Sequence, residues 1–306
     1  MKIKWPDGKS FAFTVFDDPD RDRLYNTRPV YEFLLDLGFR TTKGVWMLAA
    51  ENKEGPTGLS CDDKQYRDWI VALRKTGFEI GHHNARSHNS MRELTLKSLD
   101  NYKNLFGHDV SCMSNHYMNR EAIYWGEDRL SGFLRQVYRI VNQRRVKCQG
   151  HVSESDYFWG DLCADRIRYV RNFVYPEINT LKVCPMMPYH DPHMPYVRYW
   201  YASCEGGTLE NYVSVLSEAN QDRLVEEGGA CIMYTHYGMG FFKDGMLDKR
   251  FRALMKRLAG LNGWFVPVSE LLDFLKEQGM GRAITDKERN RLQRKWMMNK
   301  LIKGSS

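Results

Sequence analysis

The stretch GFEIGHHNARSHNS holds three of the nine histidines of the 306-residue chain, His82, His83 and His88. They follow the short run FEI at residues 78–80, which predicts a buried strand. Imidazoles gathered at a strand end are typical of a site that binds a first-row metal ion or moves protons. A polar loop rich in histidine would give the same pattern, so further ligands must be sought elsewhere in the chain.

Other polar residues directly follow predicted strands. Asp17 and Asp18 follow SFAFTVF, Asn115 and His116 follow VSCMS, and His236 follows ACIMYT. In parallel α/β folds the functional side chains gather at the carboxyl ends of the strands. Neighbouring buried carboxylates are costly unless a cation or hydrogen bonds compensate them. One carboxylate with two imidazoles suits zinc or a similar first-row ion with open coordination positions.

The strand-like runs alternate with helical patterns along most of the chain. Runs that are apolar on both faces and alternate with helices predict a mostly parallel sheet covered by helices. Their number favours a (β/α) barrel over an open sheet. The segment 185–207, with four prolines and many aromatic residues, is expected to form an ordered loop over one mouth of the sheet. We expect two parts, a barrel over residues 1–280 and a basic C-terminal helix and tail over 281–306, the helix beginning with a capping box of Thr285 and Glu288.

The charge of the chain is concentrated near its C-terminus. Between Arg282 and Lys303 lie eight basic and two acidic residues, which account for six of the seven net positive charges. A nucleic-acid-binding body is therefore not indicated. The basic helix is expected to be docked and solvated, or, as an alternative, to lie on an anionic membrane surface.

Localisation is inferred from what the sequence does not show. Neither a signal peptide nor a membrane span is recognisable, and the seven cysteines form no CxxC pair. We expect a cytoplasmic protein, with the inner face of the cytoplasmic membrane as the alternative.

Four motifs resemble those of the polysaccharide deacetylases, the NodB-homology carbohydrate esterases. FTVFDDPD resembles their Thr-Phe-Asp-Asp motif, and EIGHHNARSH is similar to their Glu-Ile-Gly-x-His…His motif. IMYTHYG is similar to their late Leu-x-His motif, and GWFVPVSELLDFL to their closing segment. The motifs occur in family order from residue 11 to about residue 276. SNHYMNREAIYWG, YFWGD and YTHYG most resemble the intracellular branch encoded with surface-polysaccharide biosynthesis genes.

The resemblance implies a distorted (β/α) barrel of about seven strands that carries a divalent metal ion. It implies Asp18, His83 and His88 as metal ligands, Asp17 as the general base and His236 as the general acid. Zinc is the expected ion, with cobalt, iron(II) and nickel as alternatives. Four residues rather than the usual three separate His83 from His88, so His82 stays open as the first histidine ligand.

Two family motifs are altered in this chain. The Arg-Pro-x-Tyr motif, whose arginine steers the base, is absent, and Arg120 is its nearest substitute. The Asp-Trp motif is recognisable only loosely, as Asp156 with Trp159 or as Trp159-Gly160-Asp161. The residues expected to contact the substrate are Asn115, His116, Trp159, Asp161 and Tyr234.

The expected activity is removal of an N-acetyl or similar acyl group from an amino-sugar intermediate of surface-polysaccharide biosynthesis. Without an export signal, a nucleotide-linked or lipid-linked sugar is expected rather than finished wall polymer. Hydrolysis of another linear amide or of an O-acetyl ester is an alternative. A catalytically silent barrel that serves as a binding protein is the alternative from a different class.

Overall fold

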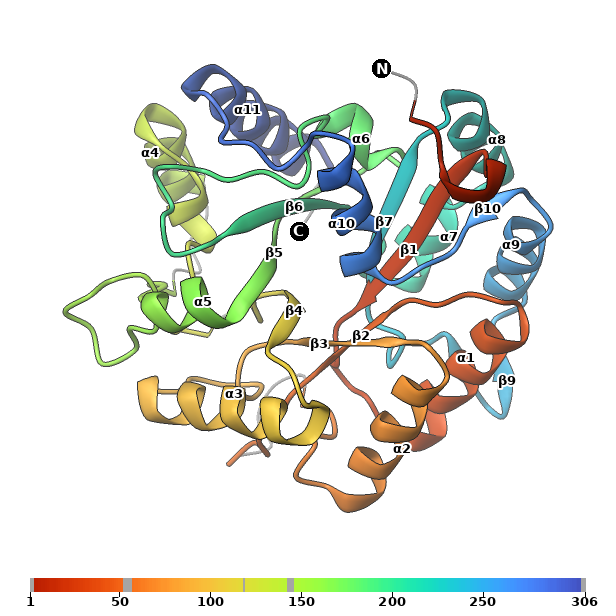
Figure 1. Cartoon of the computed structure of the whole chain (residues 1–306), viewed down its shortest axis with the longest axis horizontal. Coiled ribbons are helices and arrows are strands. Elements are labelled where there is room, and N and C mark those ends of the chain that lie inside the picture. Colours follow the sequence, from red (N-terminus) through yellow and green to blue (C-terminus); the bar gives the residue numbers. More distant parts are fainter. Residues whose placement is uncertain (1–2, 52–56, 118, 142–145, 304–306) are drawn as a thin grey trace.

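Seven parallel strands close into a barrel in the computed structural model, which describes residues 3–51, 57–117, 119–141 and 146–303 (Figure 1). The strands are paired in chain order, and β1 also pairs with β7, which closes the sheet. Their bounds are β1 Phe11–Asp17, β2 Thr42–Val45, β3 Glu79–His82, β4 Val110–Met113, β5 Ile167–Tyr175, β6 Tyr199–Cys204 and β7 Ala230–Thr235. The short β10 (Gly263–Trp264) pairs with the start of β1, and β2 pairs with its end. The predicted barrel is confirmed.

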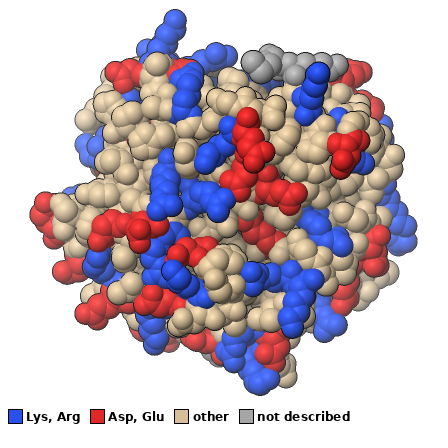
Figure 2. Space-filling model, viewed as in Figure 1, with Lys and Arg blue, Asp and Glu red and all other residues tan. Residues whose placement is uncertain are grey.

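Helices surround the barrel, and β8 (Phe242–Lys243) and β9 (Met246–Leu247) form a separate hairpin. The helices that precede β5 are α1 Leu24–Asp36, α2 Lys64–Lys75, α3 Arg92–Phe106, α4 Gly132–Val141 and α5 Gly160–Arg166. Those after it are α6 Thr180–Val183, α7 Leu209–Val215, α8 Glu218–Glu227, α9 Lys249–Ala259, α10 Val268–Glu277 and α11 Asp286–Lys303. Two 3-10 turns, η1 (Pro6–Gly8) and η2 (Gly126–Arg129), complete the described elements. On the face shown in Figure 2, basic and acidic side chains are interspersed.

The ring of Phe16 fills the barrel between β2 and β3. A Cβ atom on Gly44 would lie 2.9 Å from this ring, and one on Gly81 would lie 2.8 Å from it. Both distances are too short for a real Cβ, so only glycine leaves room for the phenylalanine. Because side chains alternate along a strand, residues an even number of positions from Phe16 in β1 and from Gly81 in β3 face the barrel interior.

The opposite face of β1 carries a buried ionic network. Asp17 lies between the barrel and the helices, where Lys43 Nζ is 2.8 Å from its Oδ2 and 2.5 Å from Asp22 Oδ2. Tyr31 of α1 donates to Asp17, and Tyr66 of α2 donates to Asp22. Burial lowers the pKa of Lys43, but the two carboxylates raise it by more, so the ammonium stays charged. The network ties α1 and α2 to β1 and β2.

The C-terminal helix α11 packs against the barrel wall. Trp296 is fully buried, and Gln293 accepts hydrogen bonds from the backbone and hydroxyl of Ser131. The predicted capping box is present, with Thr285 N donating to Glu288 Oε2 and Glu288 N to Thr285 Oγ1. Among the described residues, no helix is long and apolar enough to cross a membrane.

Replacing Lys43 with methionine is expected to lower the free energy of unfolding by about 3–5 kcal/mol, because two carboxylates would remain buried without their cation. Urea denaturation followed by tryptophan fluorescence measures this change. Lys64→Met is the matched control, since it removes only an exposed pair with Asp68 and should change stability by at most about 1 kcal/mol. Equal effects of the two substitutions would contradict a structural role for the network.

Candidate metal centre and active site

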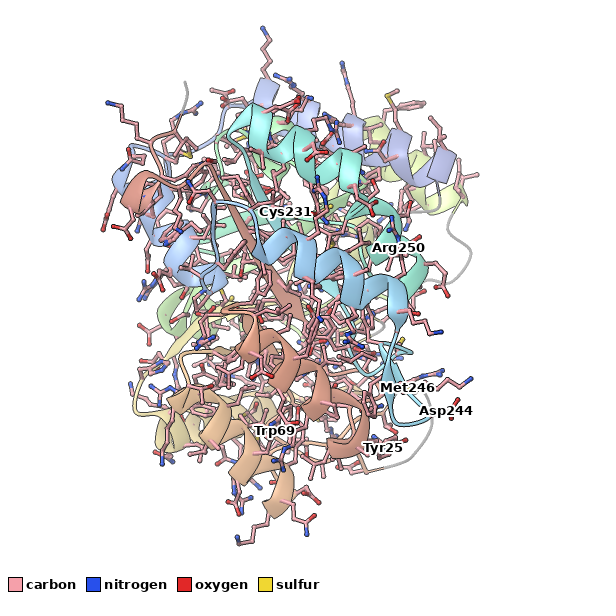
Figure 3. The ribbon with its side chains drawn as sticks, turned by 90° about the vertical axis from the view of Figure 1, so that its right-hand side faces the viewer. Tyr25, Trp69, Cys231, Asp244, Met246 and Arg250 are labelled. Atoms are coloured by element: carbon pink, nitrogen blue, oxygen red, sulfur yellow. The ribbon has the colours of Figure 1, made fainter. Side chains whose placement is uncertain are left out.

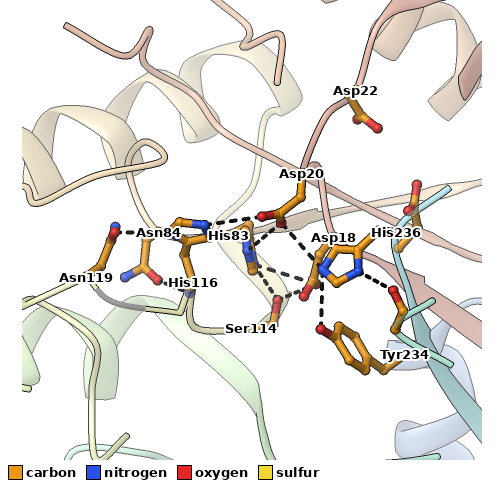
Figure 4. Close-up of polar contacts among 12 residues, drawn as sticks. Asp18, Asp20, Asp22, His83, Asn84, Ser114, His116, Asn119, Tyr234 and His236 are labelled. Carbon is orange, nitrogen blue, oxygen red and sulfur yellow. Dashed lines mark hydrogen bonds and ion pairs between the residues drawn. The ribbon is translucent and has the colours of Figure 1, made fainter. Parts of the chain in front are cut away.

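Asp20, His83 and His116 bring one ligand atom each to within 4.8 Å of one another (Figure 4). All three are buried and lie just beyond the carboxyl ends of β1, β3 and β4. His83 faces the barrel interior because it is two residues after Gly81. His82 points the other way, where its Nε2 lies 2.8 Å from Ser98 Oγ of α3. The choice between the adjacent histidines therefore falls on His83.

The hydrogen bonds of His83 leave its Nε2 free to bind a cation. Its Nδ1 lies 2.6 Å from Ser114 Oγ, and the Ser114 hydroxyl donates to Asp18 Oδ1 at 2.8 Å. Because the serine proton is used on the carboxylate, the serine oxygen must accept from Nδ1–H. The neutral imidazole then has a lone pair on Nε2, which lies 3.6 Å from Asp20 Oδ2.

His116 is held in the same tautomer by a different partner. Its Nδ1 lies 3.0 Å from the amide oxygen of Asn119. The orientation of that amide is fixed because its nitrogen donates to Arg86 O and to Glu121 Oε1. Nε2 of His116 points to Asp20 Oδ1 at 3.3 Å. The backbone of His116 is held by Asn84, whose side-chain oxygen accepts from His116 N at 2.6 Å.

A third imidazole, His236, follows the end of β7. Its Nδ1 donates to the carbonyl oxygen of Gly207 at 2.7 Å. Its Nε2 lies 3.6 Å from Asp20 Oδ2 and 3.2 Å from the hydroxyl of Tyr234. With 13% of its side chain exposed, against 2% for His83 and 6% for His116, it is the most accessible of the three imidazoles. The group is therefore closest to solvent on the side of His236.

These contacts fit a metal ion better than they fit a set of hydrogen bonds. Three imidazoles direct Nε2 at one carboxylate, and Asp20 Oδ2 is buried with no hydrogen-bond partner among the described residues. The distances of 3.3–3.6 Å between the histidine Nε2 atoms and the Asp20 oxygens are typical of neighbouring ligand atoms. In a tetrahedral site with bonds of about 2.0–2.1 Å, two ligand atoms lie about 3.3–3.5 Å apart. Asp20, His83 and His116 supply a carboxylate with two imidazoles, the donor set of zinc hydrolases and of iron(II) sites.

The charge of Asp20 is stabilised despite its burial. Burial raises the pKa of this carboxyl, but contacts with His116 and His83 lower it by more, so it falls well below its usual value. Burial lowers the pKa of His116, and Asp20 raises it beyond that loss. The pKa of His83 is lowered, chiefly by burial. An ionised carboxylate beside a neutral His83 is the state that a metal ion requires.

Asp18 belongs to a separate ion pair on the same side of the barrel. Arg171 of β5 contacts both of its oxygens, at 3.1 and 2.5 Å. Burial raises the pKa of Asp18, but Arg171 and His83 lower it by more. The guanidinium also lies 4.3 Å from the ring centre of Tyr234. Asp18 approaches Nδ1 of His83, at 3.6 Å, and this nitrogen is the one already bonded to Ser114.

Four residues lie apart from the arrangement that the resemblance implies: His88, Asp17, Arg120 and Asp18, the last of which pairs with Arg171 and is not part of the converging group. His88 lies outside the converging group, and its Nε2 accepts from the backbone of Glu51 at 3.4 Å. Burial raises the pKa of Asp17 to about 7, which suits a base, but the side chain bonds Lys43 and Tyr31 on the helix side of the sheet, away from the metal-capable group. Asp17 and Asp18 are consecutive in an extended chain, so they must face opposite sides of the sheet. Arg120 is exposed and stacks on Tyr157.

The residues predicted to contact substrate have varied surroundings. Tyr234 lies in the site, and His116 belongs to the metal-capable group. Asn115 is buried and bonded to the backbone of Ile123. Trp159 is fully buried and donates to Glu121 O, and Asp161 forms a surface ion pair with Arg92. The partners of Asn115, Trp159 and Asp161 give each of these residues a structural role.

Three contributors were missed from the sequence: Asp20, Ser114 and Arg171. Asp20 is the third carboxylate of DDPD, and its spacing of two from Asp18 could have indicated it. Arg171 interrupts the apolar run YVRNFVY, and an arginine inside a buried strand indicates a buried anion. Ser114 carries no such signal.

The comparisons with protein-family models and with curated proteins find no match. Among solved structures, the fold is similar to that of a Mycobacterium smegmatis protein assigned to the polysaccharide deacetylases. The TM-score is 0.55 at 12% identity, covering 93% of this chain and 96% of that chain. It is also similar to Puue allantoinase, with a TM-score of 0.52 at 11% identity, covering 89% of this chain and 92% of that chain. The chain therefore has the fold of the polysaccharide deacetylases.

Titration with Co²⁺ or Zn²⁺ is expected to reveal one tight site. Asp20→Asn and His116→Gln should each weaken metal binding by at least about 100-fold, because each removes a metal ligand. Loss of a residue that only orients a ligand costs about 10–100-fold. Binding should also weaken as pH falls, because the imidazoles must be unprotonated. The cobalt absorption spectrum measures both effects.

His88→Gln is the matched control and should leave the affinity unchanged. Loss of the metal in His88→Gln with retention in His116→Gln would contradict this ligand set.

Proposed function

We propose that the protein is a metal-dependent hydrolase that removes an acyl group, most simply acetyl, from the nitrogen of an amino sugar. The observation that carries the proposal is the convergence of three Nε2 atoms on the single carboxylate of Asp20, beside the separate ion pair of Asp18 and Arg171. A metal-capable group, a second carboxylate and a further imidazole are the parts that hydrolysis of an amide requires.

The residues proposed to hold the ion are Asp20, His83 and His116. A divalent ion there would polarise the amide carbonyl and acidify the attacking water. Ser114 and Asn119 keep the two imidazoles in the metal-binding tautomer through their Nδ1 protons. Partners of this kind behind the ligands orient the rings and increase their basicity.

Asp18 is proposed as the general base, one residue later than the motif resemblance implies. It faces the same interior as the metal-capable group, whereas Asp17 faces the helices. Arg171 keeps its carboxylate ionised and fixes its direction through two contacts. The carboxylate accepts the proton of the attacking water, and Arg171 takes the steering role predicted for Arg120.

His236 is proposed as the general acid. The bond from its Nδ1 to Gly207 O directs Nε2 into the site, where a proton on Nε2 can pass to the departing amine. Tyr234, which contacts this Nε2, is placed to orient the same proton or the substrate.

The amino-sugar substrate rests on the shared fold and on the motif resemblance together. We propose a nucleotide-linked or lipid-linked intermediate of surface-polysaccharide biosynthesis, handled in the cytoplasm or at the inner membrane face. Release of acetate from N-acetylated sugars by protein loaded with zinc or cobalt tests the activity. A panel that includes formyl amides, other linear amides and O-acetyl esters identifies the bond that is cleaved.

Asp18→Asn is expected to reduce kcat by about 10²–10⁴-fold, because it removes the proton acceptor, while the protein still binds one metal ion. Metal analysis and acetate release on the same sample separate the two effects. Asp17→Asn should act chiefly on stability, since it weakens the bond to Lys43. A folded, metal-loaded Asp17→Asn variant without turnover, beside an active Asp18→Asn variant, would return the base to Asp17.

Arg171→Met is expected to lower kcat and to move the acid limb of the pH–rate profile to higher pH. Arg171 lowers the pKa of Asp18, so its loss raises that pKa, and the ionised base is then present only at higher pH. Arg168→Met, on the exposed side of the same strand, should leave the profile unchanged. An unshifted acid limb in Arg171→Met would contradict the proposed pairing.

A further inference from the structure

Helices α4 and α11 lie against each other on one side of the barrel (Figure 1). Ser131, just before α4, bonds Gln293, and Tyr138 packs on Trp296 with ring centres 5.7 Å apart. The contacts occur in the same order along both helices, so the helices run in the same general direction. Their C-terminal ends therefore lie toward the same side of the molecule.

Both helices expose large apolar side chains to solvent. On α4, Phe133 is 80% and Ile140 is 77% exposed, and on α11, Ile302 is 74% exposed. Val141, Met298 and Leu301 are each more than half exposed. Within each helix the spacing of these residues places them on one face. Six large apolar side chains exposed on two packed helices are more than the isolated ones that are ordinary on a protein surface.

Cations lie on the same face of α11. Lys287, Arg291 and Arg294 are exposed, and their spacing aligns them with Met298 and with the two apolar residues of the last turn. No carboxylate in the described part of the chain pairs with these three cations. On α4, by contrast, Arg135 and Arg139 are neutralised by Glu127 and Asp128.

We propose that this surface, called here the α4–α11 face, docks the protein on an anionic lipid bilayer. It consists of Phe133, Ile140, Val141, Met298, Leu301 and Ile302 with the cations Lys287, Arg291 and Arg294. Protruding apolar side chains can enter the boundary between headgroups and acyl chains, and the cations beside them can stay among the headgroups. Negative lipid headgroups attract such cations, and acyl chains accept side chains of any shape. In this proposal the protein lies on the surface of the bilayer, with α4 and α11 toward the headgroups.

The docking face and the metal centre are separate structures. The face is built from outward side chains of α4 and α11, whereas the metal-capable residues follow β1, β3 and β4. The proposal therefore does not depend on the proposed function, although docking would suit a lipid-linked substrate. A variant that loses membrane binding should retain its metal.

Co-sedimentation of the full chain with vesicles tests the proposal. We expect binding to vesicles of phosphatidylcholine with phosphatidylglycerol, weak binding to phosphatidylcholine alone, and release by added salt. The doubly substituted variants F133S/I140S and L301S/I302S should each reduce binding at least about tenfold, because each removes two apolar side chains. R291Q/R294Q should weaken binding and reduce its dependence on salt.

Matched controls are available away from this face. Met246→Ser changes a 65% exposed side chain on the β8–β9 hairpin (Figure 3), and Lys97→Gln changes an exposed cation of α3. Both should bind vesicles as the unaltered protein does, and circular dichroism verifies that all variants are folded. Absence of binding to anionic vesicles, or binding unaffected by the three double variants, would overturn the proposal. A dimer seen by light scattering and abolished by L301S/I302S would instead assign the face to a second copy of the chain.

Discussion

The buried carboxylate of Asp20 is the constraint on which the site depends. It faces Nε2 of three histidines, and each of these imidazoles has its Nδ1 proton committed to another acceptor. In the neutral state, lone pairs of nitrogen and oxygen would face one another at 3.3–3.6 Å, which is unfavourable without a cation between them. A proton shared between His116 and Asp20 relieves one such contact. A divalent ion relieves all of the contacts that Asp20, His83 and His116 make.

The alternation of side chains along the strands separates the residues of the proposed active site from residues that bond the surrounding helices. Phe16 and Gly81 face the barrel interior. Asp18 and His83 lie two residues further along the chain and therefore face the same side. Their neighbours Asp17 and His82 face the helices, where Lys43 and Ser98 satisfy them. Adjacent residues of identical type therefore perform different tasks. Arg171 reaches Asp18 from β5, so the pairing depends on closure of the barrel.

Much of this arrangement could be predicted from the sequence, and the failures have physical reasons. The barrel, the strand ends and the capping box of Thr285 follow from local patterns. The strand β6 was expected to be part of a loop, because prolines and aromatic residues surround Tyr199–Cys204. β6 is a strand because it pairs with β5 and β7, and the residues next to it in the sequence do not indicate this pairing.

The site was harder to predict than the fold, because a metal ligand must point into the site as well as be of the right residue type. His83 and His236 were placed in the site from strand ends and motifs, and the structure brings both there. The converging group contains Asp20 and His116 instead of Asp18 and His88, and both lie in the irregular segments that follow β1 and β4. The path of the chain beyond a strand end is not encoded in the spacing of residues. Arg171 is proposed for the role that motif matching sought in Arg120, because in the closed barrel it contacts both oxygens of Asp18.

The most direct measurement is a crystal structure of the protein grown with zinc, with an anomalous difference map at the zinc edge. We predict one peak within bonding distance of an Asp20 oxygen, Nε2 of His83 and Nε2 of His116, with Asp18 still paired to Arg171. A peak bound by Asp18 and His88, or no peak at Asp20 in zinc-saturated crystals, would contradict the account.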